Sequence, residues 1–254
     1  MCGRLNMHLD PTDLVDELDI DTVGYRFAPR YNVPPGAVLP IIIDRPAESG
    51  ELVRRLESAR WGLVPGWAKE EKIGFRAFNA RSETVGSKPM FRSAFARQRC
   101  AVPVGGYYEW QTDASGAKTP WLMQAADGPL FMAGLFEFRK QVSAGAEADA
   151  TAGPGSSDPA VQDGWLVSTT IITAPAAGHL AEVHDRMPVM ITAADINAWA
   201  DPTAGKDEAQ ELLRTLVDGF DPNRVERYRV DRAVGNVRNQ SADLMAPVDE
   251  MRVP

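Results

Sequence analysis

The sequence predicts an α+β fold, and three observations support this prediction. Short runs rich in β-branched and aromatic residues recur between residues 38 and 173, whereas helical patterns are few and return only near the end of the chain. Strands and helices do not alternate regularly, as they would in a doubly wound parallel sheet. The chain has 254 residues, of which 44% are apolar, so residues 1–254 can form one domain with a full core.

The elements can be justified in order along the chain. Asp10 and Pro11 begin a first helix, followed by apolar residues at helical spacing, because proline at the first turn loses no hydrogen bond. Apolar, β-branched and aromatic runs predict strands over Val38–Ile43, Leu52–Leu63, Cys100–Val104, Trp121–Ala125, Leu130–Phe138 and Trp165–Thr173. Later patterns predict helices over Ala193–Ala200 and Lys206–Leu216 and a closing strand at Tyr228–Val230.

A segment of different composition separates two of the predicted strands. Residues 143–164 consist mainly of Ala, Gly, Ser, Asp and Pro, with almost no large apolar side chain that could offset the entropy of ordering. We therefore expect a disordered insertion over about residues 141–164, forming a long hairpin loop within one domain.

Composition also limits where the chain can act. Its apolar runs are far shorter than the roughly 20 residues that span a bilayer, so no membrane helix is expected. The first 30 residues contain six acidic residues and lack the basic start and apolar core of a secretion signal. Only two cysteines are present, too few for a disulfide framework. These features predict a cytoplasmic protein.

Charge is distributed very unevenly. The formal net charge is -8, yet residues 54–99 contain eleven basic residues against four acidic ones. A basic patch inside an acidic protein can still bind phosphates, although a solvated charged face is the plainer interpretation.

Cys2 is the first residue with unusual chemical potential. Removal of Met1 would leave an N-terminal cysteine, whose amine and thiol have unperturbed pKa values of about 8 and about 8.5. Such a 1,2-aminothiol condenses with an aldehyde to an imine, which the thiol closes into a thiazolidine. Taken alone, a cysteine at position 2 can also be accidental.

Ordered motifs give Cys2 its context. The chain resembles the SOS response-associated peptidase family, the abasic-site processing proteins, in its first residues Met1–Arg4 and in six later blocks. These blocks are Tyr31–Gly36, Trp61–Trp67, Asn79–Thr84, Tyr108–Trp110, His184–Pro188 and Ala233–Val237. The resemblance implies a strongly curved antiparallel sheet or distorted β-barrel flanked by helices. It also implies covalent attachment to abasic sites in single-stranded DNA, self-removal of Met1 and an abasic-site lyase activity.

The resemblance also implies roles for individual residues. Cys2 is the nucleophile, Glu109 the acid-base residue acting on its amine, and His184 the group that opens the deoxyribose ring. Asn79 orients the amine. By their own chemistry, Glu109 could instead be a strand-end residue paired with Arg, His184 structural, and Asn79 a turn former.

The DNA-binding residues that the resemblance and side-chain chemistry indicate are three arginines, a proline and a tryptophan. A guanidinium can hold phosphate oxygens bidentately, and an indole can stack on bases, although Trp67 could equally be a core residue. These candidates are Arg4, Pro35, Trp67, Arg81 and Arg186.

Other sites are not expected. His179 and His184 lack the spacing of a helical zinc site, Cys100 lies in an apolar strand, and no phosphate-binding glycine loop is present. We expect no metal, no cofactor and a monomer. Two alternatives remain open: a thiol peptidase acting on other proteins, and a non-covalent reader of modified DNA bases.

Overall fold

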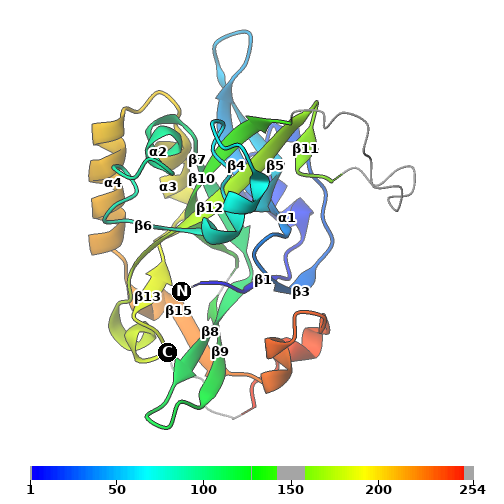
Figure 1. Cartoon of the computed structure of the whole chain (residues 1–254), viewed down its shortest axis with the longest axis vertical. Coiled ribbons are helices and arrows are strands. Elements are labelled where there is room, and N and C mark those ends of the chain that lie inside the picture. The colour runs from blue at the N-terminus through cyan, green and yellow to red at the C-terminus, as the bar shows by residue number, and fades with distance from the viewer. Residues whose placement is uncertain (1, 127, 142–157, 249–254) are drawn as a thin grey trace.

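The computed structural model describes residues 2–126, 128–141 and 158–248. It is an α+β structure in which a β-barrel lies beside a smaller sheet, as Figure 1 shows with the barrel above and the smaller sheet below. The predicted fold class is confirmed. None of the helices in the described residues is long and apolar enough to cross a membrane.

Five strands close the barrel. They are β4 (Val38–Pro46), β5 (Leu52–Trp61), β7 (Arg99–Val104), β10 (Leu130–Lys140) and β12 (Trp165–Pro175). Their order is β12-β10-β7-β4-β5, and β5 returns to β12 through the pairs Ser168↔Arg60 and Thr169↔Trp61. This last pairing is parallel, which corrects the expectation of a wholly antiparallel sheet. An odd number of strands cannot alternate in direction all the way round a closed ring.

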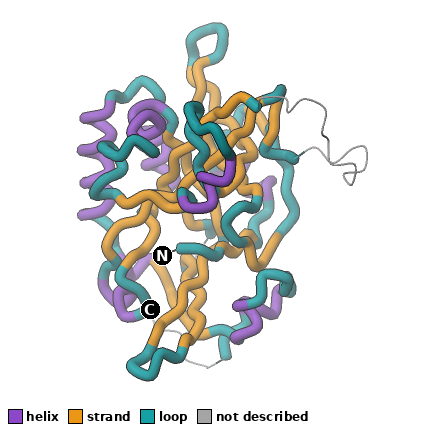
Figure 2. Tube along the Cα trace, in the orientation of Figure 1, coloured by secondary structure: helices purple, strands orange, loops and turns teal. Residues whose placement is uncertain are grey.

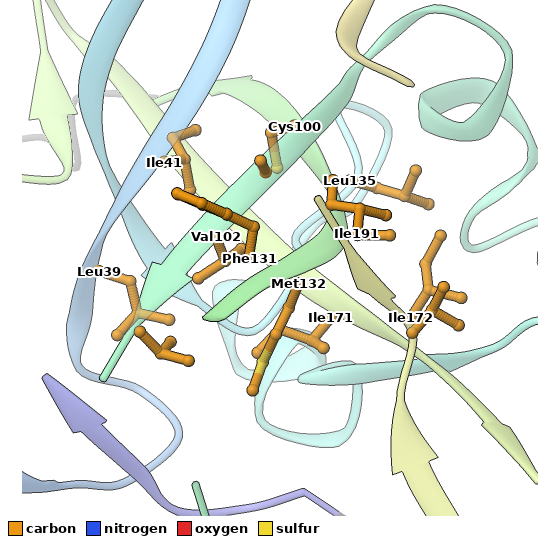
Figure 3. Close-up of a cluster of buried hydrophobic side chains, with 14 of the residues drawn as sticks. Leu39, Ile41, Cys100, Val102, Phe131, Met132, Leu135, Ile171, Ile172 and Ile191 are labelled. Atoms are coloured by element: carbon orange, nitrogen blue, oxygen red, sulfur yellow. The ribbon is translucent and has the colours of Figure 1, made fainter. Parts of the chain in front are cut away.

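The barrel core is filled by apolar side chains from several strands. Figure 3 shows side chains from β4, β7, β10 and β12 meeting in one cluster, together with Ile191 from the short strand β14 (Met190–Ile191). The middle of β10 and of β12 is buried on both faces, because helices and further strands cover the outside of the barrel. This double burial explains why these strands appear in the sequence as unbroken apolar runs.

The smaller sheet is wholly antiparallel and carries the start of the chain. Its order is β15-β9-β8-β1-β3, formed by Val225–Arg229, Lys118–Ala125, Gly106–Thr112, Leu5–Met7 and Arg30–Val33. Short strands extend the barrel sheet: β2 (Thr22–Val23), β6 (Asn79–Arg81), β11 (Val161–Gln162) and β13 (Arg186–Pro188). Of these, β6 and β13 both pair with β12 and extend toward the smaller sheet.

The helices lie mainly on one side of the barrel, as Figure 2 shows. They are α1 (Pro11–Glu17), α2 (Arg92–Arg97), α3 (Ala193–Ala200) and α4 (Lys206–Asp218), with 3-10 turns η1 (Glu71–Arg76), η2 (Gly178–Glu182), η3 (Pro222–Arg224), η4 (Arg232–Gly235) and η5 (Ala242–Met245). The predicted cap is present, since the Asp10 side chain accepts a hydrogen bond from the Thr12 amide. Buried Arg99 joins the helices to β7 by donating to main-chain carbonyls, including those of Phe95 and Trp199.

The predicted insertion needs a correction at its end. Residues 142–157 lie outside the described residues, but residues 158–164 are ordered and contain β11. Asp158 forms an ion pair with Arg60, and Ala160 is fully buried, so side-chain contacts from outside the segment offset its ordering entropy. The two flanking strands, β10 and β12, pair antiparallel from Gly134↔Ile171 to Lys140↔Trp165.

The basic stretch of residues 54–99 does not form one patch. Arg54 pairs with Asp44, Arg60 with Asp158, and Arg99 is buried against carbonyls. Ion pairs with nearby acidic residues, and with the distant Asp158 in the case of Arg60, therefore neutralise part of the local charge. Six exposed basic residues of this stretch make no ion pair with the described residues: Lys69, Arg76, Arg81, Lys88, Arg92 and Arg97.

Candidate active site

Cys2 lies where the barrel and the smaller sheet meet. The segment that leads into β1 runs beside β8, with the Tyr108 amide donating to the Arg4 carbonyl at 2.9 Å. From the other side, Asn79 on β6 donates from its Nδ2 to the Cys2 carbonyl at 2.6 Å. The parallel pairing of β6 with β12 fixes Asn79, so strands from both sheets hold the main chain of Cys2.

Glu109 lies next to this segment, in the middle of β8. Its side chain is only 6% exposed, and burial raises the pKa of its carboxyl while the nearby His184 opposes that rise. The predicted apolar setting of Glu109 is therefore present. The residue is not at the end of its strand, since β8 continues to Thr112.

The Cys2 thiol shares this buried environment. Cys2 is fully buried, and burial together with the charge of Glu109 raises the pKa of the thiol. Tyr107, also on β8, is buried as well, and its hydroxyl pKa is raised by burial and by the charges of Cys2 and Glu109. Three proton-bearing groups therefore interact in one low-dielectric region. Of these, Tyr107 lies just outside the Tyr108–Trp110 motif and carries no distinguishing signal in the sequence.

His184 lies between η2 and β13 with its side chain half-buried. Its Nδ1 atom is 3.0 Å from the Arg186 amide nitrogen and 2.8 Å from a carboxylate oxygen of Asp185. The first neighbour is a donor and the second an acceptor, so the tautomer of His184 determines which contact is a hydrogen bond. The Asp185 carboxylate is exposed, so water weakens its influence on the ring.

An open hollow of about 430 Å³ adjoins these groups. It is lined by Arg4, Glu109, Trp110, Thr112, Lys118, His184 and Gly235. Glu109 and His184, predicted as proton-transfer residues, therefore face the same space, with two basic side chains at its edge. A cavity of about 510 Å³ lies elsewhere, near β14 and α3, but Glu17 and Arg224 are its only charged lining residues among those described.

Arg4 is held in place by the chain segment that follows β15. Its Nη1 donates to Asn32 Oδ1 at 2.7 Å and to the Val234 carbonyl at 2.8 Å, and its guanidinium lies 5.5 Å from the Trp110 ring centre. Asn32, fully buried, also donates to the carbonyls of Val234 and Asn236. This network joins Arg4 to two of the later sequence motifs, Tyr31–Gly36 and Ala233–Val237, which are far apart in the chain.

Arg186 and Arg81 differ in their availability to a ligand. Arg186 forms a two-pronged ion pair with Glu83 and donates to the Thr173 carbonyl at 2.6 Å. This pairing lowers the pKa of the Glu83 carboxyl to about 2. Phosphate would therefore have to compete with Glu83 for Arg186, whereas Arg81 is exposed with no ion pair to the described residues.

Two aromatic side chains protrude from the segment between β5 and β6. Trp67 is 62% exposed, which excludes its alternative role as a core residue, and Phe75 is 68% exposed. A Cβ atom on Gly36 would lie 3.6 Å from the Phe75 ring, so Phe75 adjoins the turn that contains Pro35. Phe75 was missed in the sequence, although an aromatic residue between Lys72 and Arg76 was a usable signal.

Metal-ligating side chains do not gather in the described part of the chain: no group of three His, Cys, Asp or Glu residues is close enough to hold an ion.

Comparison with known proteins agrees with this architecture. A solved structure from Bacteroides thetaiotaomicron superposes with a TM-score of 0.73, covering 97% of this chain and 99% of that one, at 20% identity, which shows the fold alone. The abasic site processing protein YoaM of Bacillus subtilis is 32% identical, over 99% of this chain and 100% of its own length. The abasic site processing protein YedK of Escherichia coli is 30% identical, over 98% of this chain and 100% of its own.

The family itself is identified by a model that covers nearly the whole chain. The model described as SOS response associated peptidase matches residues 1–237, which include Cys2, Asn79, Glu109 and His184. The chain belongs to the SOS response associated peptidase family.

Proposed function

We propose that this chain processes abasic sites in single-stranded DNA by attaching to them covalently through Cys2. The printed names of its relatives support the substrate, since they are abasic site processing proteins. The observation that carries the chemistry is the convergence of Asn79, Glu109 and His184 on the region of Cys2. A carbonyl-reactive residue, a buried carboxylate and an imidazole are the groups that aldehyde condensation needs.

The reaction follows from these groups. An abasic deoxyribose is mainly a closed ring, and protonation of its ring oxygen by His184 opens it to an aldehyde at C1′. The Cys2 amine adds to C1′, and loss of one water molecule leaves an imine. The thiol then adds to the imine carbon while its proton goes to nitrogen, which completes a thiazolidine. Glu109 accepts and returns the protons in these steps.

Asn79 would orient the nucleophile. Its Nδ2 already holds the Cys2 carbonyl, and its buried Oδ1 has no hydrogen-bond partner among the described residues. An amine hydrogen is a suitable donor to that oxygen. Holding Cys2 at both its carbonyl and its amine would limit the amine to one direction of attack.

The proposal requires a free Cys2 amine. While Met1 is attached, the nitrogen of Cys2 is an amide and cannot form an imine. Self-removal of Met1, assisted by Glu109 and Asn79, would supply the amine and would be the peptidase step of this protein. The imine also acidifies C2′, so that elimination of the 3′ phosphate becomes a second outcome, an abasic-site lyase activity.

The DNA strand would approach across exposed side chains beside the site. Trp67 and Phe75 offer apolar ring faces to unstacked bases, and each such contact is worth roughly 1 to 3 kcal/mol. Pro35 precedes Gly36, which lies against the Phe75 ring, and Arg81 on β6 offers a guanidinium to phosphate. Unpaired bases are needed for such stacking, which favours a single strand as the substrate. Arg4 would contribute at the edge of the hollow.

The test uses the two cysteines as a matched pair. Purified protein, with removal of Met1 verified by intact mass, is incubated with a single-stranded oligonucleotide containing one abasic site and is then separated on a denaturing gel. Cys2→Ala should form no resistant adduct, because it lacks the thiol that closes the ring. Cys100→Ala should form it normally, since Cys100 is buried in the barrel.

Other outcomes would support other functions. Equal adduct formation by Cys2→Ala and the unmodified protein would remove Cys2 from the role of nucleophile. Binding of intact duplex that survives Cys2→Ala, with no adduct, would favour a non-covalent reader of modified bases. Cleavage of a separate polypeptide in the absence of DNA would favour a general thiol peptidase.

A further inference from the structure

A closed ring of contacts ties the turn η2 to the smaller sheet. The Arg227 Nη2 atom donates to the Glu182 carboxylate, and the Arg227 guanidinium lies 4.9 Å from the centre of the Trp121 ring. The Trp121 indole donates to the Gln111 side-chain oxygen at 3.3 Å, and the Gln111 amide donates to the Glu182 carbonyl at 2.8 Å. We call these four residues, Arg227, Trp121, Gln111 and Glu182, the Arg227 ring.

The Arg227 ring lies on the face of the sheet that carries Glu109. In the β8–β9 pairing, Glu109 is directly opposite Trp121. Gln111 is two residues beyond Glu109 in the same strand, and side chains two residues apart share a face. Arg227 is opposite Met123, which is two residues beyond Trp121, so it shares that face as well. The ring therefore adjoins the site directly.

Burial of Arg227 is costly and is not matched by a strong ion pair. Its side chain is 5% exposed, whereas that of its partner Glu182 is 64% exposed. The Nε and Nη1 atoms of Arg227 are buried and make no hydrogen bond within the described residues. A buried charge with so few partners is not expected to increase the free energy of unfolding. The contacts of Arg227 are better explained by a positional role, because they fix η2 against the smaller sheet.

The turn η2 determines where His184 lies. It ends at Glu182, and the amides of Val183 and His184 both donate to the Leu180 carbonyl, at 3.1 and 3.4 Å. His179 at the start of η2 also contacts the Val225 carbonyl on β15, at 3.0 Å. A movement of η2 relative to the smaller sheet would therefore move His184 relative to Glu109.

We propose that Arg227 is a positioning residue that holds His184 at the distance from Glu109 required for the reaction of Cys2. It acts through Glu182 and Trp121 and does not touch the DNA. The assignment rests on the proposed function, because the rate of covalent attachment is its main readout. Without the guanidinium, the hydrogen bond from Gln111 to the Glu182 carbonyl is the one contact of the Arg227 ring that still holds η2.

The experiment is a double-mutant cycle. Arg227→Gln and His184→Ala are compared singly and together for the maximal attachment rate and for the oligonucleotide concentration at half-maximal rate. Arg227→Gln should lower the maximal rate by about tenfold to a hundredfold, because small misplacements of reacting groups have effects of this size. The half-maximal concentration should stay unchanged. Arg227→Lys keeps the charge but lacks the planar guanidinium, so its maximal rate should lie between those of Arg227→Gln and the unmodified protein.

The cycle separates positioning from general damage. If Arg227 acts through His184, Arg227→Gln causes no further loss in the His184→Ala background. An equal proportional loss in both backgrounds, or no loss in either, overturns the proposal. Arg224→Gln is the matched control, since Arg224 is exposed three residues earlier and should leave the rate unchanged.

A second measurement does not depend on DNA. Hydrogen–deuterium exchange of residues 178–186 should be at least about tenfold faster in Arg227→Gln than in Arg224→Gln, because local opening sets exchange rates. Unchanged exchange would overturn the proposal even if the rate fell. Faster exchange in a protein whose unmodified form never attaches to DNA would support the role of the ring in holding η2 and would reject the proposed function instead.

Discussion

Burial disfavours the charged forms of both the Cys2 thiol and the Glu109 carboxyl. It raises the pKa of the thiol and the pKa of the carboxyl, so each charged form is disfavoured on its own. Transfer of a proton from the thiol to a Glu109 carboxylate, however, leaves the total charge of the pair unchanged. The proton of the thiol can therefore pass to Glu109 without adding net charge to the buried site.

Glu109→Gln is the corresponding residue-scale prediction. The variant should bind the abasic oligonucleotide as before but attach to it at least about a hundredfold more slowly, the usual scale for loss of a general base. A base must be ionised, so the attachment rate of the unmodified protein should rise with pH through a pKa raised above the usual value for Glu. Rates measured across pH 4 to 9 should lack this rise in the variant.

Glu48→Gln serves as the control for Glu109→Gln, because Glu48 is an exposed residue at the turn between β4 and β5. Equal rates and equal pH profiles for Glu109→Gln and the unmodified protein would contradict the assigned role of Glu109.

The segment between β5 and β6 is the element that presents the exposed aromatic side chains. Its two ends are drawn together at a glycine pair, since a Cβ on Gly62 would lie 2.6 Å from the Gly74 carbonyl oxygen. Gly62 also has a φ of 139°, a backbone conformation that residues with a side chain rarely adopt. The Leu63 amide donates to the Ala77 carbonyl at 3.0 Å. The segment is therefore fixed at its base and carries Trp67 and Phe75 as exposed side chains.

Removal of these aromatic rings tests the segment as a DNA-binding element. Trp67→Ala and Phe75→Ala should each weaken binding of a single-stranded oligonucleotide by roughly 1 to 3 kcal/mol, the value of one stacked base. Thermal stability should change little, because both side chains are exposed. Fluorescence anisotropy measures the binding, and Leu52→Ala, an exposed apolar residue on β5, is the control. Equal losses in all three variants would indicate nonspecific apolar contact.

At the scale of the whole molecule, a carboxyl group in the barrel makes stability depend on pH. Glu137 on β10 is buried, and burial raises its pKa from 4.5 to about 7. The side-chain amide of Gln98, oriented with its nitrogen toward the carboxylate, can donate to it at 3.2 Å. The folded protein therefore binds the proton more tightly than the unfolded chain between these two pH values. Stability falls as pH rises through this window.

Glu137→Gln should remove this dependence. At pH 8 the variant should be more stable than the unmodified protein by up to about 3 kcal/mol, whereas near pH 4 the two should be alike. Urea unfolding at several pH values measures the difference, with Glu48→Gln as an exposed control. A parallel loss of stability with pH in both Glu137→Gln and the unmodified protein would show that Glu137 is not the group responsible.

Local patterns in the sequence were sufficient to identify most elements. The apolar runs at β4, β7, β10 and β12 and the spacing in α3 and α4 each predicted the right element within a few residues, since burial is encoded by neighbours along the chain. β8 was missed. Its first residue is glycine, and it places Glu109 and Gln111 among its aromatic residues, so its pattern is not that of an apolar strand.

The sequence by itself determined the family, the barrel strands and the candidate chemistry of Cys2, because motifs and periodicity are properties of adjacent residues. Only the tertiary structure decided which charges remain free, since Arg60 and Arg186 are paired with Asp158 and Glu83, which are distant from them in sequence. It also decided that Glu109, His184 and the Arg227 ring lie together. Strand pairing and burial bring these groups into contact across the chain, and no local pattern records such pairings.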